Sequence, residues 1–315
     1  MGVKTFLRSP MARLLVVTVV ALSAGCAFLE TKQGEWIFSP VQGEWRGYRG
    51  LPAGVQEVWI PVGKKGEKLY AWWSPHADKN APALLYLHGA RWNLTGSGTR
   101  IPRWNKMGFS VLAIDYRGFG KSTFADGSAP SEHSANEDAE AAWAYLKVDP
   151  ADPRRAAVAV KQFIFGHSLG SSMATHLALK EKTASGLILE SAFTSVPDLI
   201  METKWGFLPV GLLVTQRFDN LDRMRVVTVP ILLVHGTEDN IVPFGMSERL
   251  YSAATSPKRL LRVEGGSHHN LTAAYFDAYQ RAVSEHFGLQ LNPVVPPGVP
   301  TASLGTAVQA DSALR

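Results

Sequence analysis

Short apolar runs recur between residues 55 and 263 and predict the strands of one central sheet. The run at 83–87 is apolar throughout, as expected of a strand buried on both faces. Two earlier runs flank a glycine-bounded turn and predict an antiparallel hairpin at the sheet edge. The runs, in chain order, are 55–62, 68–73, 83–87, 109–114, 162–165, 186–189, 230–234 and 260–263.

Helical patterns separate these runs, which predicts a mostly parallel sheet with right-handed crossovers. Residues 131–147 have helical periodicity, with Ser134 as a candidate N-cap and Glu137 three residues after it. A closing helix is expected over 275–287. Residues 191–229 contain no clear strand and are longer than a simple connection needs, so we expect a short helical cap over a site. The alternative is a peripheral helix that only packs on the sheet.

The N-terminus has a different pattern. Basic residues precede a short apolar run at 14–22, and small residues lead up to Cys26. This order is typical of a signal peptide, and the run is short for a membrane span. The small residues before Cys26 resemble a bacterial lipobox, which implies cleavage before Cys26 and a lipid on that residue. A plain secretory signal or an uncleaved anchor is the alternative.

The expected organisation is therefore a lipoprotein signal peptide at 1–25, an arm at 26–54 with one short helix at most, a globular domain at 55–288 and a disordered tail at 289–315. The tail is rich in proline and small residues and has little charge or periodicity. Ala27 differs from the aspartate associated with inner-membrane retention, which favours the outer membrane of a bacterial cell envelope.

Composition and charge argue against some classes of function, nucleic-acid binding among them. The 315 residues carry a formal charge of +5, but removal of 1–25 would leave 29 basic and 27 acidic residues, a charge of +2. The chain shows no basic stripe with interleaved aromatics and no zinc-finger spacing, so we expect no nucleic-acid partner. Cys26 is the single cysteine, which excludes an intrachain disulfide.

The most informative motif is G-x-S-x-G at 166–170, between a predicted strand and a predicted helix. This is the context of a nucleophile elbow, in which a strained turn exposes the hydroxyl of Ser168. Gly166 and Gly170 would relieve crowding around the side chain of that serine. The first helical turn would direct unpaired N–H groups toward the same point. An ordinary glycine-flanked turn is the structural alternative.

A serine nucleophile requires a base, and the base requires an orienting carboxylate. Asp239 follows the strand at 230–234 and is the expected acid; Glu238 beside it and Glu190 after an earlier strand are the competitors. A turn or N-cap role would be the structural alternative for Asp239.

The base is expected after the last strand, where two adjacent histidines follow a pair of glycines. His268 is favoured as the base because it completes a G-x-x-H pattern that begins at Gly265. If the motif is instead a histidine followed by Asn270, the base is His269. No further ligand at metal spacing is evident in this segment, so we expect neither a metal nor a cofactor.

These motifs, together with the H-G turn at 88–89, D-Y-R-G-F-G-K-S at 115–122 and G-T-E-D-N-I-V-P at 236–243, resemble the α/β-hydrolase superfamily over about residues 55–288. The small-cap branch that contains serine aminopeptidase-like and Bem-type hydrolases is the most similar. The resemblance implies an α/β-hydrolase fold: a mostly parallel sheet flanked by helices, with a short cap. It also implies that Asp115 is structural, with Arg117 as a partner for a carboxylate or a carbonyl, and that His88 is structural.

The resemblance further implies an oxyanion hole formed by the backbone N–H groups of Leu169 and Ala90, with Arg91 as the second candidate. A serine hydrolase acting on an ester-type bond of a small acyl substrate follows, with a carboxylesterase favoured. A peptidase or thioesterase would use the same side chains. A non-catalytic envelope lipoprotein that keeps the fold as a binding surface is the competing class.

Overall fold

The computed structural model describes residues 10–124, 129–147, 161–203, 211 and 213–291. Its centre is an eight-stranded sheet in the order β1-β2-β4-β3-β5-β6-β7-β8. β1 and β2 form the expected antiparallel edge hairpin, β2 also pairs antiparallel with β4, and the remaining neighbours are parallel. The strands are β1 Gln56–Val62, β2 Glu67–Ser74, β3 Ala83–Leu87, β4 Ser110–Ile114, β5 Gln162–His167, β6 Gly186–Glu190, β7 Ile231–Gly236 and β8 Lys258–Val263.

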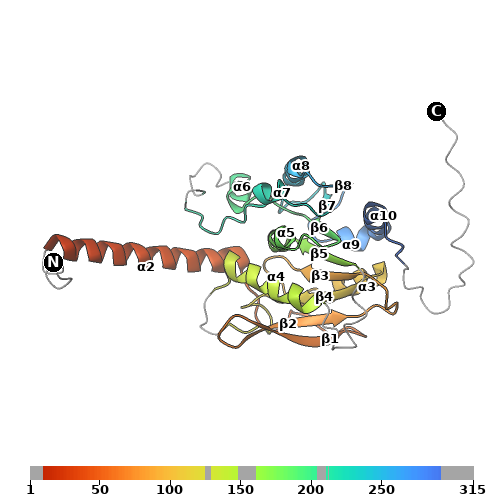
Figure 1. The fold of residues 1–315 in the computed structure, drawn as a ribbon, viewed down its shortest axis with the longest axis horizontal. Helices are drawn as coiled ribbons and strands as arrows, with labels where there is room; N and C mark the ends of the chain where they lie inside the picture. The colour runs from red at the N-terminus through yellow and green to blue at the C-terminus, as the bar shows by residue number, and fades with distance from the viewer. Residues whose placement is uncertain (1–9, 125–128, 148–160, 204–210, 212, 292–315) are drawn as a thin grey trace, which may run out of the picture.

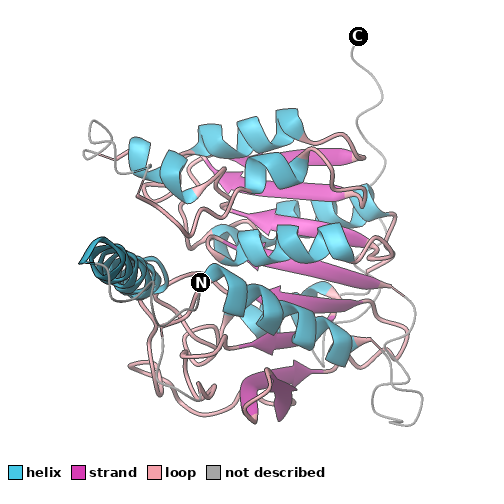
Figure 2. Cartoon of the chain, turned by 60° about the vertical axis from the view of Figure 1, so that its left-hand side comes forward, coloured by secondary structure: helices cyan, strands magenta, loops and turns pink. Residues whose placement is uncertain are grey.

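Helices cover both faces of this sheet (Figures 1 and 2). Alternation along β3 explains why its sequence is apolar throughout: Leu85 and Leu87 belong to the core on one face, and Leu84 and Tyr86 to the core on the other. The predicted α/β-hydrolase architecture is confirmed. The helices are α2 Pro10–Phe38, α3 Arg100–Met107, α4 Glu132–Leu146, α5 Gly170–Lys180, α6 Val196–Met201, α7 Asn220–Met224, α8 Phe244–Ala253, α9 Leu271–Ala274 and α10 Phe276–Phe287.

The N-terminal helix α2 is longer than the sequence predicted. It runs without a break through the expected cleavage point before Cys26, and its first half projects away from the sheet (Figure 1). Its last turns pack on the domain. Phe38 is fully buried, and the Gln33 amide donates to the carbonyl of Leu213 and accepts from the N–H of Thr215. In the described part of the chain, no helix is both long and apolar enough to cross a membrane.

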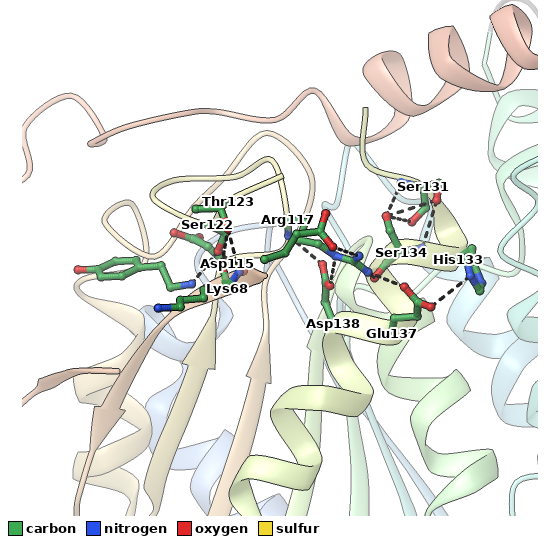
Figure 3. Close-up of polar contacts among 12 residues, drawn as sticks. Lys68, Asp115, Arg117, Ser122, Thr123, Ser131, His133, Ser134, Glu137 and Asp138 are labelled. Carbon is green, nitrogen blue, oxygen red and sulfur yellow. Dashed lines mark hydrogen bonds and ion pairs between the residues drawn. The ribbon is translucent and has the colours of Figure 1, made fainter. Parts of the chain in front are cut away.

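The N-cap of helix α4 lies three residues earlier than predicted. Ser131, not Ser134, is the N-cap: its hydroxyl accepts from the N–H of Ser134, whose own hydroxyl accepts from the N–H of Ser131 (Figure 3). The sequence favoured Ser134 because only this serine has a glutamate, Glu137, three residues after it. In the structure the hydroxyl of Ser134 instead occupies the glutamate's place in a box with Ser131. The reciprocal pair satisfies two N–H groups that the first helical turn leaves without partners.

Arg117 joins this helix to the strand end that precedes it (Figure 3). Its side chain donates to Asp138 at 2.6 Å, to Glu137 at 2.7 Å and to the carbonyl of Ser134. Asp115 accepts from the N–H of Leu94 at 2.8 Å and lies 3.3 Å from Nε2 of the buried His88. All these contacts are structural, as the sequence analysis expected for Asp115, Arg117 and His88.

The segment expected to form a cap contains α6 and α7, connected in part by residues outside the described ranges. The sequence of this segment includes Trp205, Phe207, Leu208, Pro209 and Phe218, of which Phe218 is fully buried. Trp205, Phe207, Leu208 and Pro209 lie outside the described residues, as does the expected tail from 292 onward.

Candidate active site

Ser168 occupies a sharp turn between β5 and α5. Its φ is +52°, a left-handed conformation that costs a non-glycine residue free energy and is concentrated at functional sites. The backbone N–H of Ser168 donates to the carbonyl of Glu190, at the end of the neighbouring strand, at 2.9 Å. This bond helps to hold the strained turn at the carboxyl edge of the sheet.

The two glycines of the motif are needed for close packing of α5, which differs from the predicted reason. A Cβ on Gly166 would lie 2.4 Å from the carbonyl oxygen of Gly170, and one on Gly170 would lie 2.2 Å from that of Leu87. The crowding is therefore between the helix start and the two strands below it. It does not arise mainly around the side chain of Ser168.

Asp239 and His268 are brought together from the loops after β7 and β8. His268 Nδ1 lies 2.7 Å from Asp239 Oδ2, and the other oxygen of Asp239 accepts from the N–H groups of Ile241 and Val242. Of the competing carboxylates, Glu238 is exposed and Glu190 contacts Arg100. The geometry thus pairs His268 with Asp239.

His235, at the end of β7, supports this pair and was not singled out from the sequence. Its Nε2 lies 3.3 Å from Asp239 Oδ2 and 2.9 Å from the carbonyl of Val242, and its Nδ1 lies 2.7 Å from the hydroxyl of Ser247. Burial alone would raise the pKa of Asp239. Hydrogen bonds from His235 and His268 outweigh that effect and hold this pKa well below its usual value.

His269 faces a different environment from its neighbour. Its ring is exposed and stacks on Trp92, with centroids 5.7 Å apart and an interplanar angle of 16°. Its carbonyl accepts a hydrogen bond from Arg100 at 3.0 Å. His269 therefore contributes to the wall of the site while His268 contacts the carboxylate.

A buried ion pair lies next to the elbow and the histidine loop, and no sequence pattern predicted it. Arg100, on α3, donates to Glu190 Oε1 at 2.9 Å as well as to the carbonyl of His269. Attraction to Glu190 raises the pKa of the guanidinium, although burial opposes this. One charged side chain thus links the strand end behind Ser168 to the histidine loop.

His167 completes the cluster around the elbow. Its Nε2 donates to the carbonyl of His268 at 2.9 Å. Burial lowers the pKa of His167 well below its usual value, and the nearby Arg100 adds to this. No third metal-type ligand lies near the histidine pair in the sequence, but the fold brings His167 next to His268 and His269. Sequence spacing did not indicate this because β5 and the loop after β8 are about a hundred residues apart.

Backbone donors border the same space. Ala90 and Leu169, the two expected oxyanion donors, both line the pocket. The N–H of Arg91, the second candidate, donates to the carbonyl of Phe38 at 2.9 Å and is therefore already engaged. Ala90 and Leu169 therefore stay the candidate donors of an oxyanion hole.

These groups surround a cavity of about 460 Å³. Its walls come from α2, from the loop after β3, from the elbow, from the segment around α6 and from the loops after β7 and β8. The described lining residues include no aspartate or glutamate; Ile37, Phe193, Val196, Leu199 and Ile241 provide much of the apolar wall.

Comparison with known proteins identifies the family of the chain. Residues 78–218 match the family described as serine aminopeptidase, S33. An uncharacterized protein of Mycobacterium tuberculosis is 33% identical over 260 residues, which cover 81% of this chain and 88% of that protein. The chain belongs to the α/β-hydrolase superfamily. This α/β-hydrolase is also 30% identical over 213 residues to the lysophosphatidylserine lipase ABHD12 of Xenopus tropicalis, covering 61% of this chain and 51% of the relative.

Solved structures show the same fold. An esterase of Pyrococcus furiosus superimposes with a TM-score of 0.63 at 18% identity, covering 80% of this chain and 99% of the esterase. Est1E of Butyrivibrio proteoclasticus, solved with ferulic acid, gives a TM-score of 0.55 at 19% identity, covering 72% of this chain and 96% of that one. This α/β-hydrolase therefore shares its fold with solved esterases.

Proposed function

We propose that this α/β-hydrolase is a serine hydrolase that cleaves carboxylic esters through an acyl-enzyme intermediate. One observation carries the proposal: Ser168, on a strained turn, and His268, hydrogen-bonded to Asp239, line the same cavity. A nucleophile, a base and an orienting carboxylate are the parts that acyl transfer to a serine requires.

In this mechanism His268 Nε2 takes the proton of the Ser168 hydroxyl as the oxygen attacks the ester carbonyl. The N–H groups of Ala90 and Leu169 stabilise the oxyanion of the tetrahedral intermediate. His268 then gives the proton to the departing alcohol, and the acyl group stays on Ser168. Water, deprotonated by the same imidazole, releases the acid. Asp239 holds the Nδ1–H tautomer and stabilises the imidazolium that forms in each half-reaction.

The pocket favours an ester with an apolar acyl group over the substrate of an aminopeptidase. A free α-amino group is positively charged at neutral pH and would need a carboxylate partner, and none lines the described walls. Apolar side chains such as Val196, Leu199 and Ile241 suit an acyl chain instead. The name of the vertebrate relatives, lysophosphatidylserine lipase, makes a monoacyl phospholipid a reasonable member of the substrate class to test.

We further propose that the enzyme is tethered to the bacterial cell envelope by a lipid on Cys26. Ile37 lines the pocket, and Cys26 precedes Phe38 by twelve residues, or about 18 Å of helix. A lipid there would hold the pocket close to a membrane surface, where an amphiphilic ester is concentrated.

The test uses the full chain, solubilised in detergent. It is treated with a fluorophosphonate, the adduct is mapped by mass spectrometry, and hydrolysis of p-nitrophenyl esters of increasing chain length is measured beside it. We expect the adduct on Ser168, and a kcat for Ser168→Ala that is lower by at least about a thousandfold. His268→Gln should lose a similar factor. Ser252→Ala, at an exposed serine of α8, is the matched control.

Unchanged turnover in Ser168→Ala would exclude the proposed nucleophile. A folded protein that takes no label and hydrolyses no ester would favour the non-catalytic binding lipoprotein. The tether has its own measurement: the mass of the mature N-terminal peptide from bacterial membranes should correspond to acylated Cys26, and Cys26→Ser should abolish that species.

A further inference from the structure

Three imidazole rings meet at the wall of the candidate active site. The ring centroids of His167 and His268 are 4.9 Å apart, those of His268 and His269 are 4.8 Å apart, and those of His167 and His269 are 5.9 Å apart. One nitrogen from each ring lies within 4.8 Å of the others. The mechanism above uses only one of the three side chains, so the cluster needs a separate explanation.

Hydrogen bonds fix the tautomers of the two buried rings. His167 Nε2 is bonded to a carbonyl oxygen, which can only accept, so the proton is on Nε2 and the lone pair is on Nδ1. His268 Nδ1 is bonded to the ionised Asp239, so its lone pair is on Nε2. Histidines that bind metals almost always donate their other N–H to a carbonyl or a carboxylate in this way. Two of the three rings therefore already have the outer partners that metal ligands use.

All three histidines line the pocket. A Cβ built on Gly89 would be 3.1 Å from His167 Nδ1 and 3.2 Å from the Cβ of Ser168, so this nitrogen borders the space beside the nucleophile. His269 is exposed, and its side chain can rotate without disturbing the core. Tetrahedral zinc at about 2.0–2.1 Å from each nitrogen would separate the nitrogens by about 3.3 Å, which requires a shift on the order of 1 Å.

We propose that His167, His268 and His269 form a binding site for a zinc-type divalent cation, and that the bound cation inhibits the hydrolase reversibly. The inhibition rests on the proposed function, because the metal would occupy the Nε2 lone pair with which His268 deprotonates Ser168. A water molecule or the Ser168 hydroxyl would complete the coordination.

The donor set selects the class of cation. Neutral imidazoles suit zinc, copper and nickel, whereas calcium and magnesium require oxygen ligands, and no carboxylate lines the described pocket. Two carboxylates lie just outside the ring cluster: Asp239 at His268, and Glu190 at 3.8 Å from His167 Nε2. Their negative charges oppose the repulsion that the nearby Arg100 would exert on a cation.

The experiment compares metal binding with activity. The full chain is stripped of metal with a chelator, and zinc alone is titrated into the Ser168→Ala protein by isothermal calorimetry, which needs no turnover. In parallel, ester hydrolysis by the unsubstituted protein is measured against free zinc, magnesium and calcium, and excess chelator is added afterwards. We expect one bound zinc per chain, inhibition by zinc alone and full recovery with chelator.

Two variants remove single ligands. In His167→Gln the side-chain amide can still donate to the carbonyl of His268, but no nitrogen lone pair faces the pocket; His269→Gln removes the exposed ligand. Each should weaken zinc binding and raise the half-inhibitory zinc concentration by about tenfold or more, since even loss of an outer partner costs about 10–100-fold in affinity. His133→Gln, at an exposed histidine of α4, should change neither quantity.

The outcomes separate this proposal from the proposed function. Labelling of Ser168 in chelated buffer together with no zinc binding would overturn the metal site and leave the hydrolase intact. Zinc binding that both glutamine variants leave unchanged, or activation by zinc, would also overturn it. Binding without any labelling of Ser168 would retain the site and refute the serine mechanism.

Discussion

The guanidinium of Arg100 donates to the carboxylate of Glu190 at 2.9 Å, and both side chains are buried. The two residues come from α3 and from the end of β6, so the pair joins elements on the two sides of the elbow. The same guanidinium holds the carbonyl of His269, next to the residue proposed as the base. The pair therefore acts on both the stability of the domain and the position of the histidine loop.

Arg100→Met should lower the free energy of unfolding by about 3–5 kcal/mol, because it leaves the carboxylate of Glu190 buried without its partner. The double variant Arg100→Met/Glu190→Gln should recover part of that loss. In contrast, Arg259→Met breaks an exposed pair with Glu285 and should cost less than about 1 kcal/mol. Denaturant unfolding measures the stability of all three variants. Equal losses in Arg100→Met and Arg259→Met would contradict a stabilising role for the buried pair.

His235 should act as a positioning residue for Asp239. His235→Leu removes the contact to the Asp239 carboxylate and should lower kcat by roughly tenfold to a hundredfold with little change in KM, because the imidazole of His268 loses its fixed orientation. His235→Gln, whose amide can still donate, should retain more of the activity. A loss that appears mainly in KM, or equal losses in the two variants, would instead indicate a general disturbance of the fold.

Gly170→Ala tests the packing at the elbow. The added methyl would lie 2.2 Å from the carbonyl oxygen of Leu87, a backbone atom that cannot move aside cheaply. We expect a loss of about 1–3 kcal/mol in stability, measured by denaturant unfolding. Gly98→Ala is the control, since the nearest atom to its new methyl is 3.5 Å away. The prediction is wrong if the two alanine variants are equally stable.

Stability should fall in mild acid. Burial lowers the pKa of His167 in the folded state, so below the usual histidine pKa of about 6.5 the unfolded chain binds a proton that the folded chain does not. Unfolding free energy should therefore decrease as pH falls below about 6.5, by up to about 1.4 kcal/mol per pH unit for this one group. His167→Gln should reduce the pH dependence of the unfolding free energy by the equivalent of one proton. The same dependence in the variant would show that His167 is not its cause.

Much of the fold followed from residue patterns because its strands are short, buried and regularly spaced. β3 and β4 were placed to within one residue, since burial on both faces produces an unbroken apolar run. The length of α2 was missed because its apolar first half was interpreted only as a leader sequence. The cap of α4 was placed one helical turn late because Ser134 and Glu137 match the usual capping-box pattern, whereas the box in the structure pairs Ser131 with Ser134.

The site divides in a similar way. The Asp239–His268 pair could be predicted because each residue follows a predicted strand near a recognisable motif. Arg100 and Glu190 were not paired, since ninety residues separate them and only the sheet order brings α3 beside the end of β6. His167 was missed as a neighbour of His268 for the same reason: proximity across loops from non-adjacent strands leaves no local signal.

The bond from Arg91 N–H to the carbonyl of Phe38 has a consequence for how this enzyme could be released from a surface. The last turn of α2 connects the proposed tether to the domain, and its residue Ile37 also lines the pocket. A protease that cuts before Gln33 would free an intact enzyme, because the docked turns stay with the domain. A cut after Phe38 would free a chain with an open-sided pocket, so shedding and inactivation are separated by only a few residues of one helix.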